Sequence, residues 1–432
     1  MKQLTRALAG LAMAVAIVGI GGIAPAGVHA NSAHRSNVTL TFWHYFTDRA
    51  DLFNHFAAQY KKLTGVTVKM EVYSGDVLGQ KFQAAAQSRT LPDISAAWAG
   101  VGDVTAPYAK EGIIANLSKP MAQGWGKEFV KAYLDSASFP KGNTYGVKPG
   151  PYLVPIDANN MQFLYNKTLF KRAGIKSTPK TWSEFIADGN KLAKLGVAPF
   201  VAGFGSWVLD AMAQPYMWNI VGKADLVKTF AGKEKYTTKP WVNFLTAWQK
   251  LGQSSALAQG ILADDDPAAE SLFVNGRAGM IFDGSWAIGV FKQQNPNFQN
   301  YGVFFPPSAG KFQVRIPGGV GAMAFVVGTS PHKAEAIKFL QWLTAPTQEA
   351  KYAVSSNNLP ANKFVAGKVK MNSVLTAFAK NMNKLIPSLT TGQTAAVATT
   401  MDKGLQDILA GQASPQDVAS RMQLAQQTGL PH

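Results

Sequence analysis

Hydrophobic and polar residues follow two different periods along the first part of the chain, which predicts strands and helices in alternation. Residues 38–43 form a short apolar run typical of a strand, and apolar residues then recur at helical spacing until Gly65. Residues 66–72 alternate apolar and polar side chains, a second helical pattern follows, and residues 91–97 form a third strand pattern. This β-α-β-α-β order predicts an α/β protein with an open, mainly parallel sheet flanked by helices.

The residues that directly follow the predicted strands are the first candidates for a binding site. Ligands of open parallel sheets bind at the carboxyl ends of the strands. Two residues follow the first strand, residues 74–76 follow the second, and a tryptophan follows the third. The candidates from this sheet are His44, Tyr45, Asp76 and Trp98.

Later segments carry signals for helix starts. Thr181 and Glu184 have the spacing of a capping box, and an apolar stripe over residues 241–251 predicts an amphipathic helix whose two tryptophans lie in the core. Residues 330–331 and 414–415 are Ser-Pro pairs, which predict an N-cap followed by proline at the first helical position.

Two clusters of proline and glycine, at residues 149–155 and 306–319, indicate that the chain leaves one lobe and later returns to it. A mature chain of roughly 400 residues also exceeds what one hydrophobic core usually supports. The expected division is 37–150 and 316–355 for lobe 1, and 151–315 and 356–430 for lobe 2.

Residues 1–30 have the pattern of a signal peptide. Lys2 and Arg6 give a positive start, residues 8–20 are apolar, and small residues at Val28 and Ala30 precede the expected cleavage site. The apolar run is shorter than the roughly 18 residues that a membrane span requires. The chain contains no cysteine, which excludes disulfides, thiolate metal sites and a lipoprotein anchor. We therefore expect an extracytoplasmic protein, either periplasmic or at the cell surface.

The chain is basic, with a formal charge of +17 at pH 7 and of +15 once the two basic residues of the signal peptide are removed. A charge of this size can indicate an anionic partner. The basic residues are scattered in ones and twos, however, and no stacking motif of interleaved aromatic residues occurs. We therefore do not expect binding to nucleic acid.

The usual motifs of enzymes and metal sites do not occur. There is no GxSxG, no P-loop, no HExxH and no calcium-loop spacing, and the six histidines have no metal-binding spacing. Three consecutive acids at 264–266 precede Pro267, a pattern typical of a helix N-terminus as well as a conceivable cation site. We expect the helix start, and no catalytic residue, metal or cofactor.

Aromatic residues give a more positive indication, because several of the ten tryptophans lie in segments rich in glycine and small polar residues. A sugar ring is bound by aromatic rings stacked on its apolar face and by polar side chains at its hydroxyl rim. Each tryptophan can equally belong to the core. The candidates are Trp98, Trp207, Trp218 and Trp286, with Asp210 and Asp283 as nearby partners for hydroxyl groups.

Three segments resemble the extracellular solute-binding proteins of family 1, the sugar-binding proteins of ABC transporters. The first reads VPIDANNMQFLYNK at 154–167 and continues to PKTWSEF at 179–185. The second is LPDI at 91–94, and the third runs from LFVNGRAGM to DGSW over 272–286. Residues 318–327, 333–343 and 359–363 also fit the family, so the resemblance spans nearly all of the mature chain.

The resemblance implies the two-lobed type II fold of periplasmic binding proteins, each lobe a mainly parallel sheet flanked by helices, with the ligand cleft between the lobes. It implies a monomeric, non-enzymatic receptor that binds a carbohydrate, expected to be an oligosaccharide, and delivers it to the transmembrane subunits of an ABC permease. It places Trp98 and Trp286 as sugar-stacking rings. It places these residues beside the cleft: His44, Tyr45, Asp76, Gly318 and Gly319. In the second lobe Trp207, Asp210 and Trp218 align less closely with the family.

Two other functions fit parts of the sequence. A receptor for an anionic solute, such as a uronate oligosaccharide or a glycerol phosphate, would need Arg49 or Arg315 in the cleft, because a buried anion must be paired. An exported carbohydrate-cleaving enzyme would need two converging carboxylates, for which Asp210 and Asp283 are the candidates.

Overall fold

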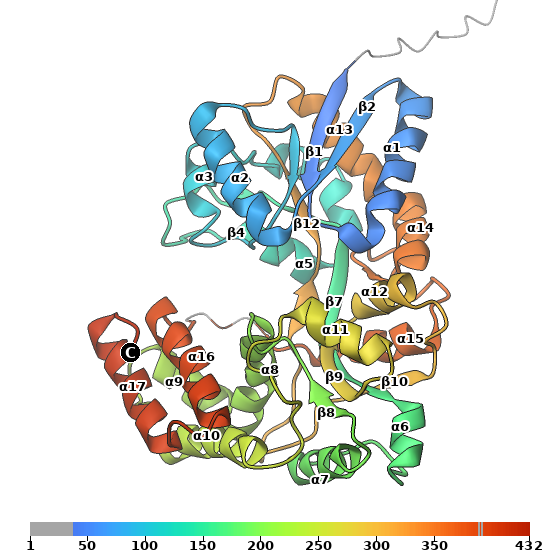
Figure 1. Ribbon diagram of the computed structural model, residues 1–432. Coiled ribbons are helices and arrows are strands. Elements are labelled where there is room, and N and C mark those ends of the chain that lie inside the picture. The colour runs from blue at the N-terminus through green and yellow to red at the C-terminus, as the bar shows by residue number, and fades with distance from the viewer. Residues whose placement is uncertain (1–37, 388, 390–391) are drawn as a thin grey trace, which may run out of the picture. The chain divides into compact units, whose positions relative to one another are not determined.

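The computed structural model describes residues 38–432 apart from 388, 390 and 391 (Figure 1). The predicted signal peptide, residues 1–30, lies outside the described residues. Among the helices that are described, none has the length and apolar character needed to cross a membrane. The described residues belong to one compact unit, so the exact lobe boundaries stay a prediction.

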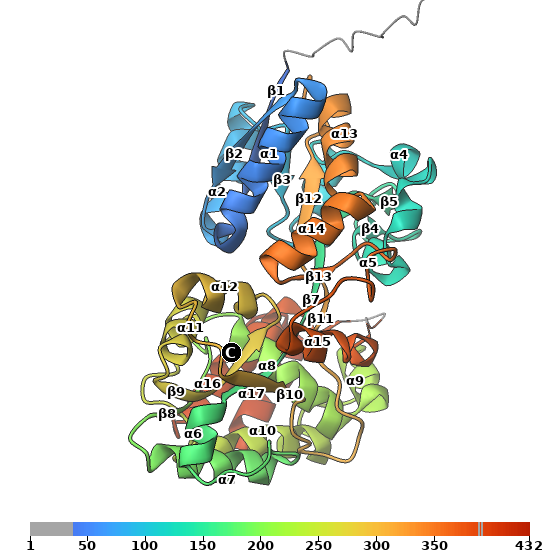
Figure 2. The ribbon, with the colours of Figure 1, turned by 90° about the vertical axis from the view of Figure 1, so that its right-hand side faces the viewer.

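The first sheet has five strands and contains the predicted β-α-β-α-β start. Its strands in spatial order are β2 (Thr67–Val72), β1 (Thr39–His44), β3 (Ile94–Ala96), β12 (Met323–Val326) and β6 (Val154–Pro155). The first three are parallel, as predicted, whereas β12 runs antiparallel to both of its neighbours. Helices α1 (Ala50–Thr64), α2 (Gly75–Ser88) and α13 (Lys333–Leu343) pack against this sheet (Figures 1 and 2).

Helix α1 shows how the sequence determines these elements. Its residues Phe53, Phe56 and Tyr60 recur at helical spacing and are buried, so they hold the helix against the sheet. The helix ends at Gly65, whose φ of 80° lies in the left-handed region that glycine adopts without strain.

The second sheet has six strands arranged around the long strand β7. The order β10 (Tyr301–Phe304), β7 (Asp157–Asn166), β9 (Ala278–Gly284), β8 (Ala198–Val201) forms its main path, and β11 (Gly318–Val320) and β13 (Leu359–Pro360) also pair with β7. Of these pairs only that between β8 and β9 is parallel. The expectation of a mainly parallel sheet in both lobes is therefore wrong for this one. The hydrophobic pattern of a strand does not reveal the direction in which it pairs with its neighbours.

The remaining elements are mostly helices, and a two-stranded sheet pairs β4 (Ser138–Phe139) with β5 (Gly150–Pro151). The other helices of the first half are α3 (Ala106–Lys110), α4 (Ser118–Ala122), α5 (Lys131–Ser136), α6 (Lys167–Arg172), α7 (Trp182–Ala193), α8 (Val208–Tyr216) and α9 (Lys223–Phe230). Those of the second half are α10 (Lys239–Gly252), α11 (Asp266–Val274), α12 (Ala287–Gln294), α14 (Pro346–Ser356), α15 (Ser373–Ala379), α16 (Ala395–Leu409) and α17 (Pro415–Thr428). Short helical turns are η1 (Thr47–Arg49), η2 (Trp125–Glu128), η3 (Met217–Val221) and η4 (Met382–Lys384).

The predicted helix starts are mostly confirmed. Thr181 and Glu184 form the capping box of α7, and Ser414 caps α17. The Ser-Pro pair at 330–331 is an exception, because α13 begins only at Lys333.

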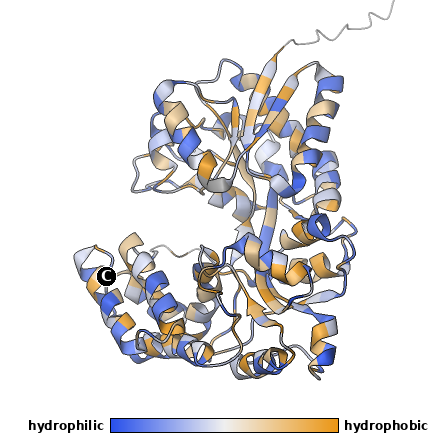
Figure 3. Cartoon of the chain, viewed as in Figure 1, coloured by the Kyte–Doolittle hydropathy of each residue, from blue (hydrophilic) through white to orange (hydrophobic). Residues whose placement is uncertain are grey.

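The long helices carry hydrophobic residues on one side and hydrophilic residues on the other, which Figure 3 shows as alternating colours. On α10 this places Trp241 and Trp248 fully in the core, as predicted, together with Phe244, Leu245 and Leu251.

Candidate functional site

Two of the predicted tryptophans, Trp207 and Trp286, lie next to each other. Trp286 directly precedes α12, and Trp207 directly precedes α8. Their ring centroids are 5.9 Å apart with the planes inclined by 44°. The Trp207 ring is 55% exposed, whereas that of Trp286 is half-buried and lies against the Cα of Gly284, where a side chain would overlap it. The chain thus builds an accessible aromatic surface from two distant segments.

Carboxyl groups lie beside this aromatic pair. The side chain of Trp286 lies close enough to Asp266, the first residue of α11, to lower the pKa of that carboxyl group. Asp266, Glu270 and Asp283 each place one carboxylate oxygen within 4.8 Å of the others. Asp283 is fully buried at the end of β9, and one of its oxygens accepts a hydrogen bond of 2.6 Å from the backbone N–H of Gly284.

Burial and mutual repulsion change the protonation of these acids. Burial and then the charge of Asp265 raise the pKa of Asp266 to about 6. Burial and then the charge of Asp266 raise the pKa of Glu270 to about 9. The pKa of Asp283 is also raised, by burial first and by the other two carboxylates next.

The sequence interpretation named Asp283 but did not include Asp266 and Glu270 in the site. The sequence did contain an indication of this cluster, because Asp266 and Glu270 are four residues apart and therefore lie on one face of the predicted helix. The prediction that the run at 264–266 starts a helix is confirmed, since the side chain of Asp265 caps α11 by accepting from the N–H of Ala268.

Trp98 and Tyr45 are partly buried at the ends of strands in the first sheet. The Trp98 ring packs against Phe82, with 4.9 Å between ring centroids, and against Phe325 at 5.9 Å. The Tyr45 hydroxyl donates to the backbone oxygen of Ala97 at 3.3 Å. The two predicted residues therefore lie near the same stretch of backbone, and both keep some exposed surface.

His44 was expected to face a ligand, but the structure places it in the aromatic core, with no exposed surface. Its ring stacks on Phe46 and Phe53, at 5.4 and 5.3 Å between centroids. Its Nδ1 accepts a hydrogen bond from the N–H of Phe46. Strand position alone could not reveal this, because the chain turns immediately after His44 and folds Phe46 back over the ring.

Trp218 is buried, whereas Asp210 is only partly buried. Trp218 is buried in the wide turn η3, which is typical of a core residue. Asp210 lies on α8 and accepts a hydrogen bond of 3.0 Å from Gln214. Burial raises the pKa of Asp210, and its charge is the second cause, after burial, that raises the pKa of Asp402 to about 6.

The two glycines predicted beside the cleft lie in β11. Gly318 and Gly319 have φ values of 148° and 142°, in the region that favours glycine. A side chain at Gly318 would come within 2.5 Å of the Asn159 carbonyl oxygen, whereas at Gly319 nothing lies within 4 Å. Asp76 belongs to α2, and its side chain lies outside the described part of the structure.

The arginines proposed for an anionic solute are already engaged. Arg49 forms ion pairs with Asp48 at 3.0 Å and with Asp157 at 2.6 Å, and it also donates to the Tyr352 hydroxyl at 2.6 Å. Arg315 donates to the backbone oxygen of Leu385 at 3.1 Å. Arg49 is thus paired with acids of the protein itself, whereas Arg315 forms no ion pair among the described residues.

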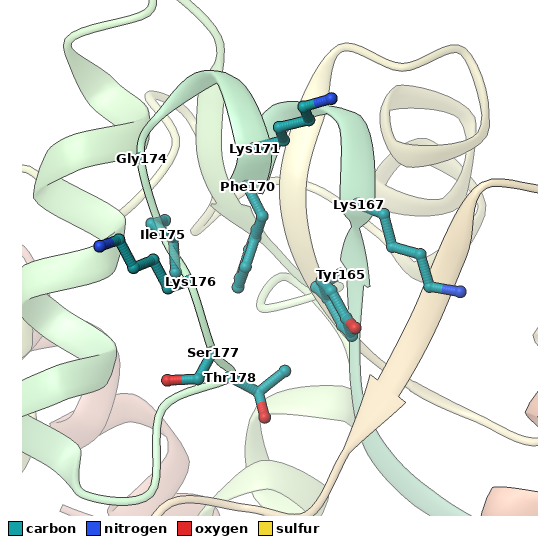
Figure 4. Close-up of a pocket in the computed structure, with 9 residues that line it drawn as sticks. All are labelled: Tyr165, Lys167, Phe170, Lys171, Gly174, Ile175, Lys176, Ser177 and Thr178. Carbon is teal, nitrogen blue, oxygen red and sulfur yellow. The ribbon is translucent and has the colours of Figure 1, made fainter.

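A separate surface cavity of about 540 Å³ lies beside α6 (Figure 4). The rings of Tyr165 and Phe170 lie in its middle, while the amino groups of Lys167, Lys171 and Lys176 point outward at its margin. None of the predicted site residues lines it. Asn166 beside it caps α6 by accepting from the N–H of Leu169, so the Tyr-Asn-Lys segment has a structural role here.

Comparison with protein families gives a match over most of the described chain. The family described as bacterial extracellular solute-binding protein matches residues 45–350. Among curated proteins, the multiple sugar-binding protein of Streptococcus mutans is 30% identical over 51% of this chain and 54% of its own length. The diacetylchitobiose binding protein DasA of Streptomyces coelicolor is 26% identical over 88% of this chain and 87% of its own.

Solved structures show the same fold at lower sequence identity. A chitin oligosaccharide binding protein superposes with a TM-score of 0.74 at 22% identity, covering 91% of this chain and 99% of its own. The maltose-bound MalE3 of T. maritima gives 0.76 at 18% identity, covering 91% of this chain and 100% of its own. The two-lobed type II fold expected from the sequence is thereby confirmed.

Proposed function

This chain belongs to the bacterial extracellular solute-binding proteins, and from this membership we propose that it is the carbohydrate receptor of an ABC importer. It binds an oligosaccharide in the cleft between its lobes and delivers it to a membrane permease, without cleaving it. The relatives from Streptococcus mutans and Streptomyces coelicolor, which are described as sugar-binding proteins, support this proposal. The protein acts as a monomer outside the cytoplasm after removal of residues 1–30.

The observation that carries the proposal is the pair formed by Trp207 and Trp286. A pyranose ring stacks its C–H face on an indole, and the inclined second indole can contact the same ring or the next one along a chain. The carboxyl group of Asp266, which is only partly buried, lies beside Trp286, where it can accept a hydrogen bond from a sugar hydroxyl. An aromatic surface with polar groups at one edge is suited to a carbohydrate.

The alternatives find less support. A receptor for an anionic solute would place cations at the ligand, but the groups beside Trp286 are acids and Arg49 is paired with Asp48 and Asp157. A glycosidase would need two carboxyls that converge on one bond. Asp210 neighbours Gln214 and Asp402, whereas Asp283 neighbours other acids, so the two belong to separate clusters.

The proposal is tested by screening mono- and oligosaccharides for an increase in melting temperature. A ligand at a hundred times its Kd stabilises the folded state by about 2.7 kcal/mol. Isothermal titration calorimetry on the hits then compares the parent with the Trp207→Ala variant. Because Trp207 is 55% exposed, its loss should leave the apo melting temperature unchanged and weaken sugar binding about tenfold or more.

The matched control is Phe364→Ala, which removes another exposed aromatic ring, 48% exposed, that is far from Trp207 in the sequence. This variant should bind sugar like the parent. If Trp207→Ala binds as tightly as the parent, the aromatic pair is not the sugar site. If no carbohydrate raises the melting temperature but an anionic solute does, the ligand class proposed here is wrong.

A further inference from the structure

Three carboxyl groups from two adjacent elements share one small space beside the aromatic pair. Asp266 and Glu270 lie one turn apart on α11, which packs against β9, and Asp283 is near the end of β9. One oxygen of each lies within 4.8 Å of the others. The packing of α11 against the strand that follows it in the sequence brings the three acids together.

The cluster lacks compensating groups. Glu270 is 5% exposed and Asp283 is fully buried. The Oδ2 atom of Asp283 and the Oδ1 atom of Asp266 are buried without a hydrogen-bond partner in the described part of the structure. The ion pairs found among the described residues include none of these three acids.

The surroundings add negative charge. Asp48, in η1, is one of the acids whose charge raises the pKa of Glu270, and its own Oδ2 is buried without a partner in the residues described. The cation nearest to Asp48 in the chain, Arg49, is shared between Asp48 and Asp157. Buried carboxylates without a counter-charge are costly, so they are either protonated or matched by a cation.

We propose that Asp266, Glu270 and Asp283 form a binding site for a divalent metal cation, with Ca²⁺ as the ion that fits best. Ca²⁺ binds oxygen ligands at 2.3–2.6 Å, so two ligands on opposite sides of the ion lie about 5 Å apart. The three carboxylate oxygens, none more than 4.8 Å from another, fit around one such ion. The bound ion gives the buried Oδ2 of Asp283 a partner, and water or other oxygens complete the coordination.

The site stands on the geometry of the acids and does not depend on sugar binding. The ion would nevertheless hold α11 against the end of β9, and so fix Asp266, which lies beside Trp286. It would also replace the repulsion between the carboxylates with attraction. Metal binding should therefore raise stability whether or not sugar is present.

The experiment uses the mature protein after treatment with chelator. Calorimetric titration with Ca²⁺ at pH 7.5 should show one site, with a Kd of about 0.1–1 mM if it resembles other extracellular calcium sites. The melting temperature should be higher in excess Ca²⁺ than in EDTA at equal ionic strength. If no binding heat appears and the melting temperatures in Ca²⁺ and EDTA are the same, the cluster is a set of protonated acids and the proposal is overturned.

Two variants and a matched control locate the ion. Asp283→Asn and Glu270→Gln each remove one charged ligand at nearly constant shape, so each should weaken Ca²⁺ binding at least about tenfold. Asp264→Asn removes an acid from the same run that is not part of the cluster, so it should keep most of the affinity. If Asp283→Asn and Glu270→Gln are folded and bind Ca²⁺ like the parent, the site lies elsewhere. Titrating sugar into the same samples shows separately whether the receptor function holds.

Discussion

Burial decides what an ionisable side chain does in this protein, and His44 is a clear case. It is fully buried and stacks on Phe46 and Phe53. Its hydrogen bond among the described residues is with the backbone N–H of Phe46, and no acid is bonded to the ring. Burial first, and then the charge of Arg49, lower its pKa to about 4. The ring is therefore neutral at pH 7 and acts as an aromatic core residue.

The lowered pKa of His44 predicts that acid weakens the fold. In the unfolded chain a histidine takes up a proton near pH 6.5, whereas in the folded protein it does so only near pH 4. Its contribution to stability is thus fully present above pH 6.5 and is lost as the pH falls toward 4, by up to about 3 kcal/mol. Urea unfolding at several values between pH 7.5 and 4.5 measures this loss.

The His44→Phe variant separates this contribution from that of other groups. It keeps the stacking but leaves the Phe46 N–H without its acceptor, so it should be less stable than the parent at pH 7.5 by about 1–3 kcal/mol. The difference should shrink as the pH falls, because the variant has no buried imidazole to protonate. His55→Gln, at an exposed position of α1, is the control. A difference between parent and His44→Phe that stays constant with pH would contradict the assignment.

The tryptophans show how far the sequence predicts the site at this scale. Helical spacing correctly placed Trp241 and Trp248 in the core. It could not distinguish Trp207, which is 55% exposed, from Trp218, which is buried, because both lie in irregular or wide-turn segments without a repeating pattern. The contact between Trp207 and Trp286 depends on the packing of two distant segments, which no local pattern contains.

At the scale of elements, capping signals were reliable where the side chain had no competing partner. The Ser-Pro pair at 330–331 failed because the Ser330 hydroxyl donates to Asp93 at 2.5 Å. The same hydroxyl accepts from the N–H of His332, and the helix then starts at Lys333. A tertiary contact with a buried acid thus replaced the local cap. The direction of strand pairing in the second sheet was hidden for a similar reason, since it depends on how β7 meets strands from later in the chain.

The capping box of α7 gives a prediction at this scale. The Thr181 hydroxyl accepts from the N–H of Glu184, and the Glu184 carboxylate accepts from the N–H of Thr181. Thr181→Ala should therefore lower the free energy of unfolding by about 1 kcal/mol. Ser183→Ala, at an exposed position of the same first turn, should have little effect. Equal stability of the two variants in chemical denaturation would show that the box contributes nothing.

At the scale of the whole molecule, the segments that connect the two sheets meet at the start of β7. Residues 157–160 pair with both β11 and β13. The Asp157 carboxylate accepts from Arg49 and Tyr352, each at 2.6 Å, and from the N–H of Ala322 at 2.6 Å. This one side chain therefore joins η1, β7, α14 and the segment before β12. A hinge motion between the lobes must therefore either leave the hydrogen bonds of Asp157 intact or break them.

Hinge closure is the prediction that belongs to this scale. A ligand that contacts both lobes shifts the population toward conformations in which the lobes close around it. Small-angle scattering of the mature protein should therefore give a smaller radius of gyration with saturating sugar than without it. Trp207→Ala, at the same sugar concentration, should show less of this change because fewer molecules are occupied. If the parent is saturated by calorimetry and its radius of gyration does not change, the sugar binds without closure, and the connection at Asp157 acts as a rigid joint.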